Sequence, residues 1–215
     1  MAKLRAVLFD LDGTLRDTRE LIHDALDYAF RAHGLRSPSR EELRPYIHHL
    51  SFVHDEFASG IDPEAFGASY SARTNELLPQ VQLYADVERI LSIVHDLYKV
   101  AVVTAGQSAP QYIERYGLTA YIDTIVGAND ITKQKPDPEG IDVALKRLGV
   151  EPSGSVMIGD LATDIRAAEA ANLATSIGIT HGFGTAERLT QAGADYIIDS
   201  LAELPAILQQ IDDKR

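Results

Sequence analysis

The sequence predicts an α/β protein in which a helical segment interrupts a Rossmann-like, doubly wound parallel sheet. After residue 84, short apolar runs alternate with stretches of helical periodicity, which is typical of a parallel sheet with helices on both faces. One further apolar run, residues 6–9, stands alone near the N-terminus, and residues 16–82 between them show only helical spacing. We therefore expect an α/β core domain of residues 1–15 and 83–215 and an inserted four-helix domain of residues 16–82.

The first expected strand, Ala6-Val7-Leu8-Phe9, is continuously apolar, as strands buried on both faces are. Later apolar runs predict further strands at residues 99–103, 124–126, 155–159, 174–179 and 196–198. Helices are expected between and after them, at residues 87–97, 111–116, 138–148, 162–171, 187–192 and 201–211. Four helices are also expected in the insertion, starting near Asp17, Ser39, Phe52 and Asp62. An insertion of this kind is expected to fold over the sheet edge that it interrupts, as a lid.

The amino-acid composition excludes several kinds of chemistry and partner. The 215 residues contain 45% hydrophobic residues and no cysteine, which excludes disulfides, thiolate nucleophiles and cysteine-bound zinc. A net charge of −12 argues against nucleic-acid and anionic-membrane partners, which need basic surfaces. The apolar runs are too short for a signal peptide or a membrane span, so a cytoplasmic protein is expected. An acidic chain can still bind an anionic substrate if a metal ion lies between them.

Two carboxylates follow the first strand, in Phe9-Asp10-Leu11-Asp12-Gly13-Thr14. Side chains alternate along extended chain, so Asp10 and Asp12 can face one ligand. Asp-Gly is also an ordinary turn dipeptide. A calcium loop of EF-hand type is excluded, because Gly13 is at the fourth position and not the sixth, and Leu21 occupies the twelfth position, which requires glutamate.

Two other strands end in polar residues, Thr104 and Asp160. Ligands of open parallel sheets bind beyond the carboxyl ends of the strands, so these side chains should meet Asp10 there. Each has a structural alternative, a strand-end hydroxyl for Thr104 and a helix N-cap for Asp160, while Asp164 suits a first helical turn. Lys135, before Pro136, is the expected cation, although Lys133 could share its role.

These motifs resemble, in order, the four motifs of the haloacid dehalogenase-like hydrolases. The helical insertion resembles the C1 cap of the branch that contains phosphoglycolate phosphatases and β-phosphoglucomutases. The resemblance implies that Asp10 is the nucleophile that forms an aspartyl-phosphate and that Asp12 is the general acid and base. It also implies that Thr104 and Lys135 take part in catalysis.

The resemblance further implies a Mg²⁺ ion, held by the carboxylate of Asp10, the backbone carbonyl of Asp12 and Asp160, with Asp164 ligating or orienting. The implied phosphate-binding residues are Leu11, Asp12, Thr104, Ala105, Gly106 and Lys135. The amides near Ala105 and Gly106 are expected to act at a helix start.

The implied activity is hydrolysis of a small phosphorylated metabolite, phosphoglycolate-like or a sugar phosphate, by a monomer or homodimer. Dehalogenases of the superfamily lack the second aspartate, and residues 16–98 contain no lysine for Schiff-base phosphonate chemistry. A phosphomutase on the same core and a catalytically silent binding protein remain as alternatives. The candidates for contacts to the rest of the substrate are Arg16, Arg44, His48 and His49.

Overall fold

The structure, a computed structural model, describes residues 3–47, 49–106 and 108–214. The chain forms two compact units, an α/β unit of Met1–Arg16 and Leu83–Arg215 and a helical unit of Asp17–Gln82. Arg16, which we expected in the insertion, belongs to the α/β unit.

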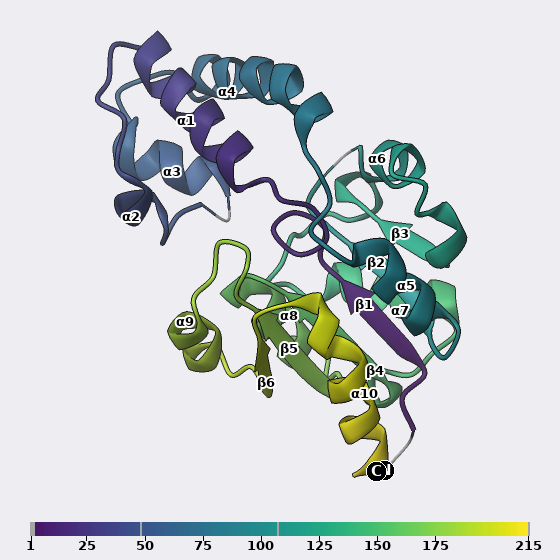
Figure 1. Cartoon of the computed structure of the whole chain (residues 1–215). Coiled ribbons are helices and arrows are strands. Elements are labelled where there is room, and N and C mark those ends of the chain that lie inside the picture. Colours follow the sequence, from purple (N-terminus) through teal and green to yellow (C-terminus); the bar gives the residue numbers. More distant parts are fainter. Residues whose placement is uncertain (1–2, 48, 107, 215) are drawn as a thin grey trace. The chain divides into compact units, whose positions relative to one another are not determined.

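The α/β unit is built on a six-stranded sheet in the order β3-β2-β1-β4-β5-β6, in which all neighbours are parallel (Figure 1). The strands are β1 (Ala6–Phe9), β2 (Lys99–Val103), β3 (Thr124–Val126), β4 (Ser155–Gly159), β5 (Thr175–Ile179) and β6 (Tyr196–Ile198). The predicted α/β class with a Rossmann-like parallel sheet is confirmed. The chain runs outward from β1 in both directions, so the order reverses beside β1, where open α/β sheets bind ligands.

The register aligns the carboxyl ends of the three central strands. Phe9, the last residue of β1, pairs with Val102 on one side and Ile158 on the other. The residues that follow these strands, Asp10 and Asp160 among them, therefore leave the sheet at the same level. This alignment is what the predicted site requires.

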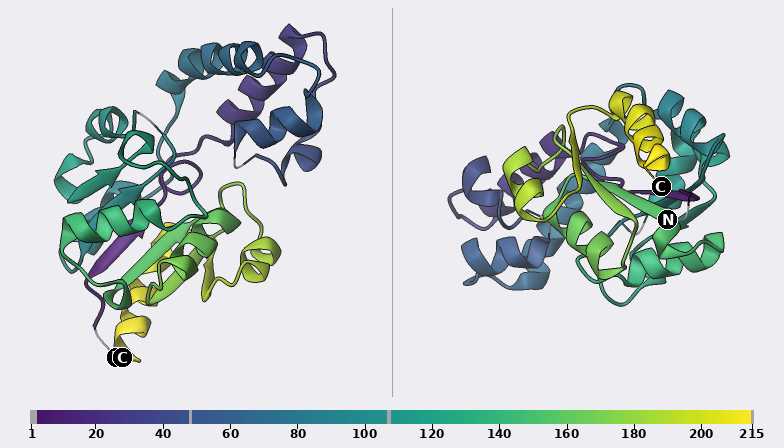
Figure 2. Two further views of the ribbon diagram at one scale, coloured as in Figure 1. Left: turned by 180° about the vertical axis from the view of Figure 1, so that it is seen from behind. Right: turned by 90° about the horizontal axis from the view of Figure 1, so that it is seen from below.

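Helices cover both faces of the sheet (Figure 2). Val7 and Phe9 of β1 point into a cluster with α5 (Val87–His95), α6 (Ala109–Arg115) and α10 (Leu204–Asp213). Ala6 and Leu8, on the opposite face, pack with α7 (Glu139–Leu148) and α8 (Ala162–Ala170). Strand β1 is fully buried, which explains its unbroken apolar sequence. A small separate cluster joins α8 to α9 (Ala186–Gln191).

The last helix begins later than the helical spacing predicts. A 3₁₀ turn, Leu201–Glu203, precedes α10, which starts at Leu204 with Pro205 in its first turn. Proline has no N–H to donate to the carbonyl of the preceding turn, so the α-helix begins beside it. The short 3₁₀ segments elsewhere are Leu78–Gln80, Thr119–Tyr121, Ala128–Asp130 and Pro152–Gly154.

The helical unit contains α1 (Arg19–Ala32), α2 (Arg40–Leu43), α3 (Leu50–Phe57) and α4 (Pro63–Leu77). Its core contains aliphatic and aromatic residues, and the rings of Phe30 and Phe66 pack edge to face with their centroids 5.1 Å apart. Ser39 forms the capping box that its sequence predicts. The start of α1 differs, because the Thr18 side chain forms no cap and Asp17 accepts the N–H of Arg19 instead. Within the described part of the chain, no helix is both long and apolar enough to cross a membrane.

Candidate active site

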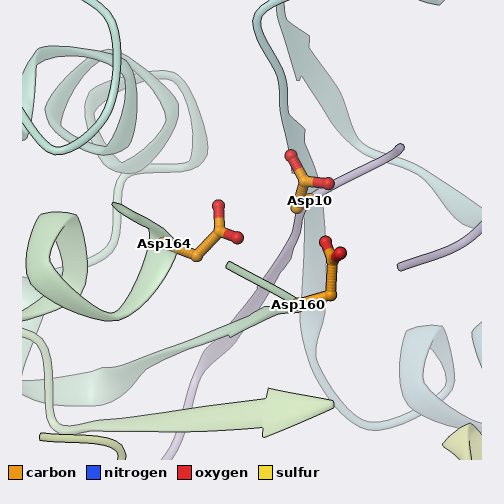
Figure 3. A group of neighbouring side chains, drawn as sticks. All are labelled: Asp10, Asp160 and Asp164. Atoms are coloured by element: carbon orange, nitrogen blue, oxygen red, sulfur yellow. The ribbon is translucent and has the colours of Figure 1, made fainter. Parts of the chain in front are cut away.

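Three buried carboxylates gather at the carboxyl edge of the sheet (Figure 3). Asp10 follows β1, Asp160 follows β4, and Asp164 lies in the first turn of α8. One oxygen from each lies within 4.8 Å of the others. The exposed fractions are 7% for Asp10, 0% for Asp160 and 1% for Asp164. The structure thus brings together all three acids that were expected to meet here.

Lys135 is the cation of this cluster. Its Nζ donates to Oδ1 of Asp10 at 2.6 Å, to Oδ1 of Asp164 at 2.5 Å and to the carbonyl of Val103 at 3.1 Å. Lys133 instead forms an exposed ion pair with Asp137 at 3.3 Å. The geometry therefore selects Lys135 from the two candidate lysines.

Negative charge exceeds positive charge in this buried cluster. Burial raises the pKa of Asp10 to about 7, although the Lys135 ammonium acts against the shift. Burial and the charges of Asp10 and Asp164 hold the pKa of Asp160 well above its usual range. Burial alone would lower the pKa of Lys135, but the two carboxylates outweigh it and leave that pKa raised. A further cation would relieve the remaining repulsion.

The donor set fits a hard divalent cation. Carboxylate oxygens are the ligands that Mg²⁺ and Ca²⁺ prefer, and Asp10, Asp160 and Asp164 each offer one oxygen within 4.8 Å of the other two. The excess of buried negative charge is the second sign of such a site, since buried charges are normally paired or coordinate metals. The acidic cluster is therefore a candidate metal centre.

A loop after β5 fixes Asp160, and the sequence analysis missed it. The N–H of Phe183 donates to Oδ2 of Asp160 at 2.7 Å, and Thr14 Oγ1 donates to Oδ1 at 3.2 Å. A Cβ at Gly182 would lie 2.2 Å from Asp160 Oδ2, and one at Gly13 would lie 2.4 Å from it. Two glycines in the segment His181-Gly182-Phe183-Gly184 were the available signal, because glycine permits such close approach.

Asp164 is oriented by its own helix start. The N–H of Leu161 donates to Asp164 Oδ2 at 3.0 Å, so Asp164, and not Asp160, takes part in capping α8. The structural alternative for Asp160, a helix N-cap, is thus wrong. Gly159 leaves room for Asp164, because a Cβ there would lie 2.3 Å from its side chain.

Asp12 and Thr104 lie beside one another at the same edge. A Cβ at Gly106 would be 3.5 Å from Thr104 Oγ1 and 3.9 Å from Asp12 Oδ2, which places both side chains around that glycine. The N–H of Gly106 donates to Thr104 Oγ1 at 3.1 Å. Helix α6 begins only at Ala109, so the amides of Ala105 and Gly106 belong to a loop and not to the expected helix start.

The candidate substrate residues that the structure describes are divided between the two units. Arg16 lies in the α/β unit and pairs with Asp12, its Nε 2.7 Å from Oδ1. Arg44 and His49 lie in the helical unit, where Arg44 pairs with Glu41 at 3.1 Å and His49 accepts the N–H of Ser51 at the start of α3. His48 lies outside the described residues.

The fold and this cluster together define a class of enzyme. Residues 7–177 match the haloacid dehalogenase-like hydrolase family, and the chain belongs to it. The resemblance seen in the four sequence motifs is thereby confirmed.

Individual relatives indicate which hydrolases of this family the chain is similar to. The chain is 30% identical to the pyrophosphatase PpaX of Bacillus velezensis over 211 residues, covering 94% of this chain and 95% of that protein. It is 28% identical to the phosphoglycolate phosphatase of Vibrio parahaemolyticus, covering 94% of each. A predicted phosphatase from Clostridium acetobutylicum has a similar structure, with a TM-score of 0.82, 28% identity and coverage of 97% of this chain and 100% of that one. The prediction of a phosphoric monoester hydrolase is confirmed at this level.

Proposed function

We propose that this protein is a Mg²⁺-dependent phosphatase that hydrolyses a small phosphorylated metabolite through an aspartyl-phosphate on Asp10. The observation that carries the proposal is the position of Asp10. Its carboxylate lies at the carboxyl end of the central strand, within 4.8 Å of two further acids, and accepts a hydrogen bond from Lys135 at 2.6 Å. A nucleophile, a cation for the phosphoryl group and a set of metal ligands thus converge on one point.

In the first step a carboxylate oxygen of Asp10 attacks the phosphorus atom. The bond from phosphorus to the leaving oxygen breaks, the electron pair stays on that oxygen, and Asp12 supplies its proton. In the second step water attacks the phosphorus, Asp12 takes a proton from the water, and the bond from phosphorus to Asp10 breaks. Inorganic phosphate leaves and both aspartates return to their starting state.

Lys135 and Thr104 act on the phosphoryl group. The ammonium of Lys135 already contacts Asp10, so it lies where negative charge develops on the transferring group. Thr104 Oγ1, which accepts the N–H of Gly106, still has its own proton to donate to a phosphate oxygen. When bound by Asp10, Asp160, Asp164 and the carbonyl of Asp12, Mg²⁺ would neutralise charge on the phosphate oxygens.

Magnitudes show why all of these groups are needed. Phosphate-monoester hydrolysis is accelerated by up to ~10²¹ in enzymes, whereas one positioned acid or base contributes about 10²–10⁴. Electrostatic stabilisation by the metal and Lys135 must supply much of the difference. The names of the relatives make inorganic pyrophosphate and 2-phosphoglycolate the first substrates to assay.

The test is turnover of p-nitrophenyl phosphate with and without Mg²⁺. We expect activity that EDTA abolishes, that Mg²⁺ restores, and that Asp10→Asn reduces by at least about a thousandfold, since the nucleophile is removed. The control is Asp137→Asn, a half-buried acid that pairs with Lys133 and lies outside the cluster, which should leave turnover unchanged. Mg²⁺-dependent turnover that persists in Asp10→Asn would refute the mechanism.

A further inference from the structure

His181 and Tyr84 form a stacked pair next to the loop that holds Asp160. Their ring centroids are 3.7 Å apart and the ring planes differ by 14°. Tyr84 Oη donates to the backbone carbonyl of His181 at 3.1 Å, and the Tyr84 N–H donates to the carbonyl of Leu15 at 3.0 Å. These contacts join the loop after β5 to the turn after β1 and to the segment before α5, all within the α/β unit.

His181 also connects this loop to a residue that contacts Asp160 directly. Its Nε2 lies 3.0 Å from the carbonyl oxygen of Thr14, and since a carbonyl can only accept, Nε2 carries the proton. Thr14 is fully buried, and its Oγ1 donates to Asp160 Oδ1 at 3.2 Å. Two residues beyond His181, the N–H of Phe183 donates to Asp160 Oδ2 at 2.7 Å. Both oxygens of Asp160 are therefore held by residues that His181 bonds to or lies two positions from.

Asp160 depends on such support because its neighbours repel it. Its side chain is fully buried, and one of its oxygens lies within 4.8 Å of an oxygen of Asp10 and of Asp164. Like charges at this distance favour orientations that separate them, whereas a bound cation requires the three carboxylates to converge. Hydrogen bonds that fix the Asp160 carboxylate before the ion binds reduce the cost of that convergence.

We propose that His181, held in place by Tyr84, is a positioning residue for Asp160 and thereby sets the affinity of the carboxylate cluster for its divalent cation. His181 acts through the carbonyl of Thr14 and through the backbone of the loop that carries Phe183. This inference rests on the proposed function, because it takes Asp160 to be a metal ligand.

The test measures the affinity for Mn²⁺, an ion that takes the same oxygen ligands as Mg²⁺, from the electron paramagnetic resonance signal of the free ion. His181→Ala removes both the ring and its donor. His181→Phe keeps a ring to stack on Tyr84 and removes only the donor to Thr14. Tyr84→Phe removes the hydroxyl that donates to the His181 carbonyl. Thermal unfolding in EDTA measures the stability of each variant without metal.

We expect His181→Ala to raise the dissociation constant for Mn²⁺ by about ten- to hundredfold, the range for residues that orient a metal ligand. His181→Phe and Tyr84→Phe should each raise it by about two- to tenfold, the range for one hydrogen bond. A constant in His181→Ala within about twofold of the wild type would overturn the inference. If that variant does not fold, unchanged constants in both His181→Phe and Tyr84→Phe would overturn it.

Turnover of p-nitrophenyl phosphate gives a second measurement. In the His181 and Tyr84 variants, the Mg²⁺ concentration for half-maximal activity should rise by the same factor as the dissociation constant. Excess Mg²⁺ should then restore the kcat of the wild type, because the bound ion itself holds Asp160. A loss of kcat that excess Mg²⁺ leaves in place would contradict the inference.

Two matched variants separate positioning from stability. Tyr98→Phe loses a tyrosine hydrogen bond, to Asp212 at 2.9 Å, directly before β2 at the opposite edge of the sheet. His95→Ala removes a histidine at the end of α5 whose Nε2 lies 3.7 Å from Asp123. Both should bind Mn²⁺ as tightly as the wild type, even where the Tm falls. Weakening in these controls equal to that in the His181 and Tyr84 variants would overturn the inference, since lost stability would then explain it.

Asp160→Asn distinguishes failure of the inference from failure of the proposed function. Weak Mn²⁺ binding in Asp160→Asn together with normal binding in His181→Ala refutes only the inference. If Asp160→Asn binds Mn²⁺ as tightly as the wild type, Asp160 is not a ligand, and the proposed metal site fails as well.

Discussion

Removing the ammonium of Lys135 should destabilise the metal-free protein and strengthen its binding of Mg²⁺. Lys135→Met keeps the length of the side chain and removes the charge. Lys135 Nζ is hydrogen-bonded to Asp10 and Asp164 at 2.6 and 2.5 Å, and its side chain is 11% exposed. The variant leaves three buried carboxylates with no basic side chain bonded to them in the described part of the chain.

The magnitude follows from the cost of breaking a buried ion pair, about 3–5 kcal/mol when one partner is removed. In a chain of this size, about 1 kcal/mol shifts the Tm by about 2–4 °C. The metal-free variant should therefore melt roughly 6–20 °C below the wild type. Mg²⁺ should raise its Tm by more than it raises that of the wild type, because the ammonium no longer repels the ion.

Differential scanning calorimetry in EDTA and in increasing Mg²⁺ measures both effects. Lys133→Met is the matched control, since its exposed pair with Asp137 should contribute less than about 1 kcal/mol. Equal Tm values for Lys135→Met and the wild type in EDTA would refute the account of the cluster. So would a Mg²⁺-induced shift in the variant no larger than that of the wild type.

Three further predictions concern pH and packing. The pKa of Asp10 is raised from 3.8 to about 7, so its contribution to stability is present below pH 3.8 and is lost as the pH rises toward 7. Urea unfolding in EDTA should show a larger loss in the wild type than in Asp10→Asn, in which the raised pKa of Asp160 still contributes. Gly182→Ala places a Cβ 2.2 Å from Asp160 Oδ2 and should weaken the affinity for Mg²⁺ at least tenfold, as measured by calorimetry. An unchanged affinity would contradict this and show that the loop moves to make room for the methyl group. Tyr98→Phe loses the hydrogen bond to Asp212 at 2.9 Å and should cost about 1–2 kcal/mol in urea unfolding, while an unchanged midpoint would contradict this.

The fold was predictable because central strands such as β1 and β4 are buried on both faces. A short unbroken apolar run such as Ala6–Phe9, followed by turn residues, is typical of a strand buried on both faces. The order of the strands was not predictable in this way, because β1 pairs with β2 and β4, which follow it by many residues. Such pairings depend on contacts that no local pattern records. The start of α10 was also missed, although Pro205 was its signal.

The acidic cluster was predictable because strand ends fix where side chains emerge. Asp10 and Asp160 directly follow neighbouring strands, so parallel pairing alone brings them together. The support from Gly182 and Phe183 was not visible, since the loop reaches Asp160 through a backbone N–H and a missing Cβ. A backbone N–H is common to almost every residue type, and glycine occurs for many structural reasons, so neither feature marks a site residue in the sequence. Only the folded structure shows which glycine and which N–H contact Asp160.

The residue type of Arg16 indicates a possible contact to the substrate, but it does not indicate the partner that the side chain binds. Asp12 and Arg16 stand four residues apart, the spacing of a helical ion pair, but Gly13 has a φ of 87° and the segment is a turn. Hydrogen bonds from Arg16 N to Leu11 O and from Gly13 N to Arg16 O close that turn and bring the guanidinium onto Asp12. Both Nε and Nη2 of Arg16 then donate to the Asp12 carboxylate. The sequence could suggest a cation near the substrate, whereas the turn determines that this cation pairs with Asp12.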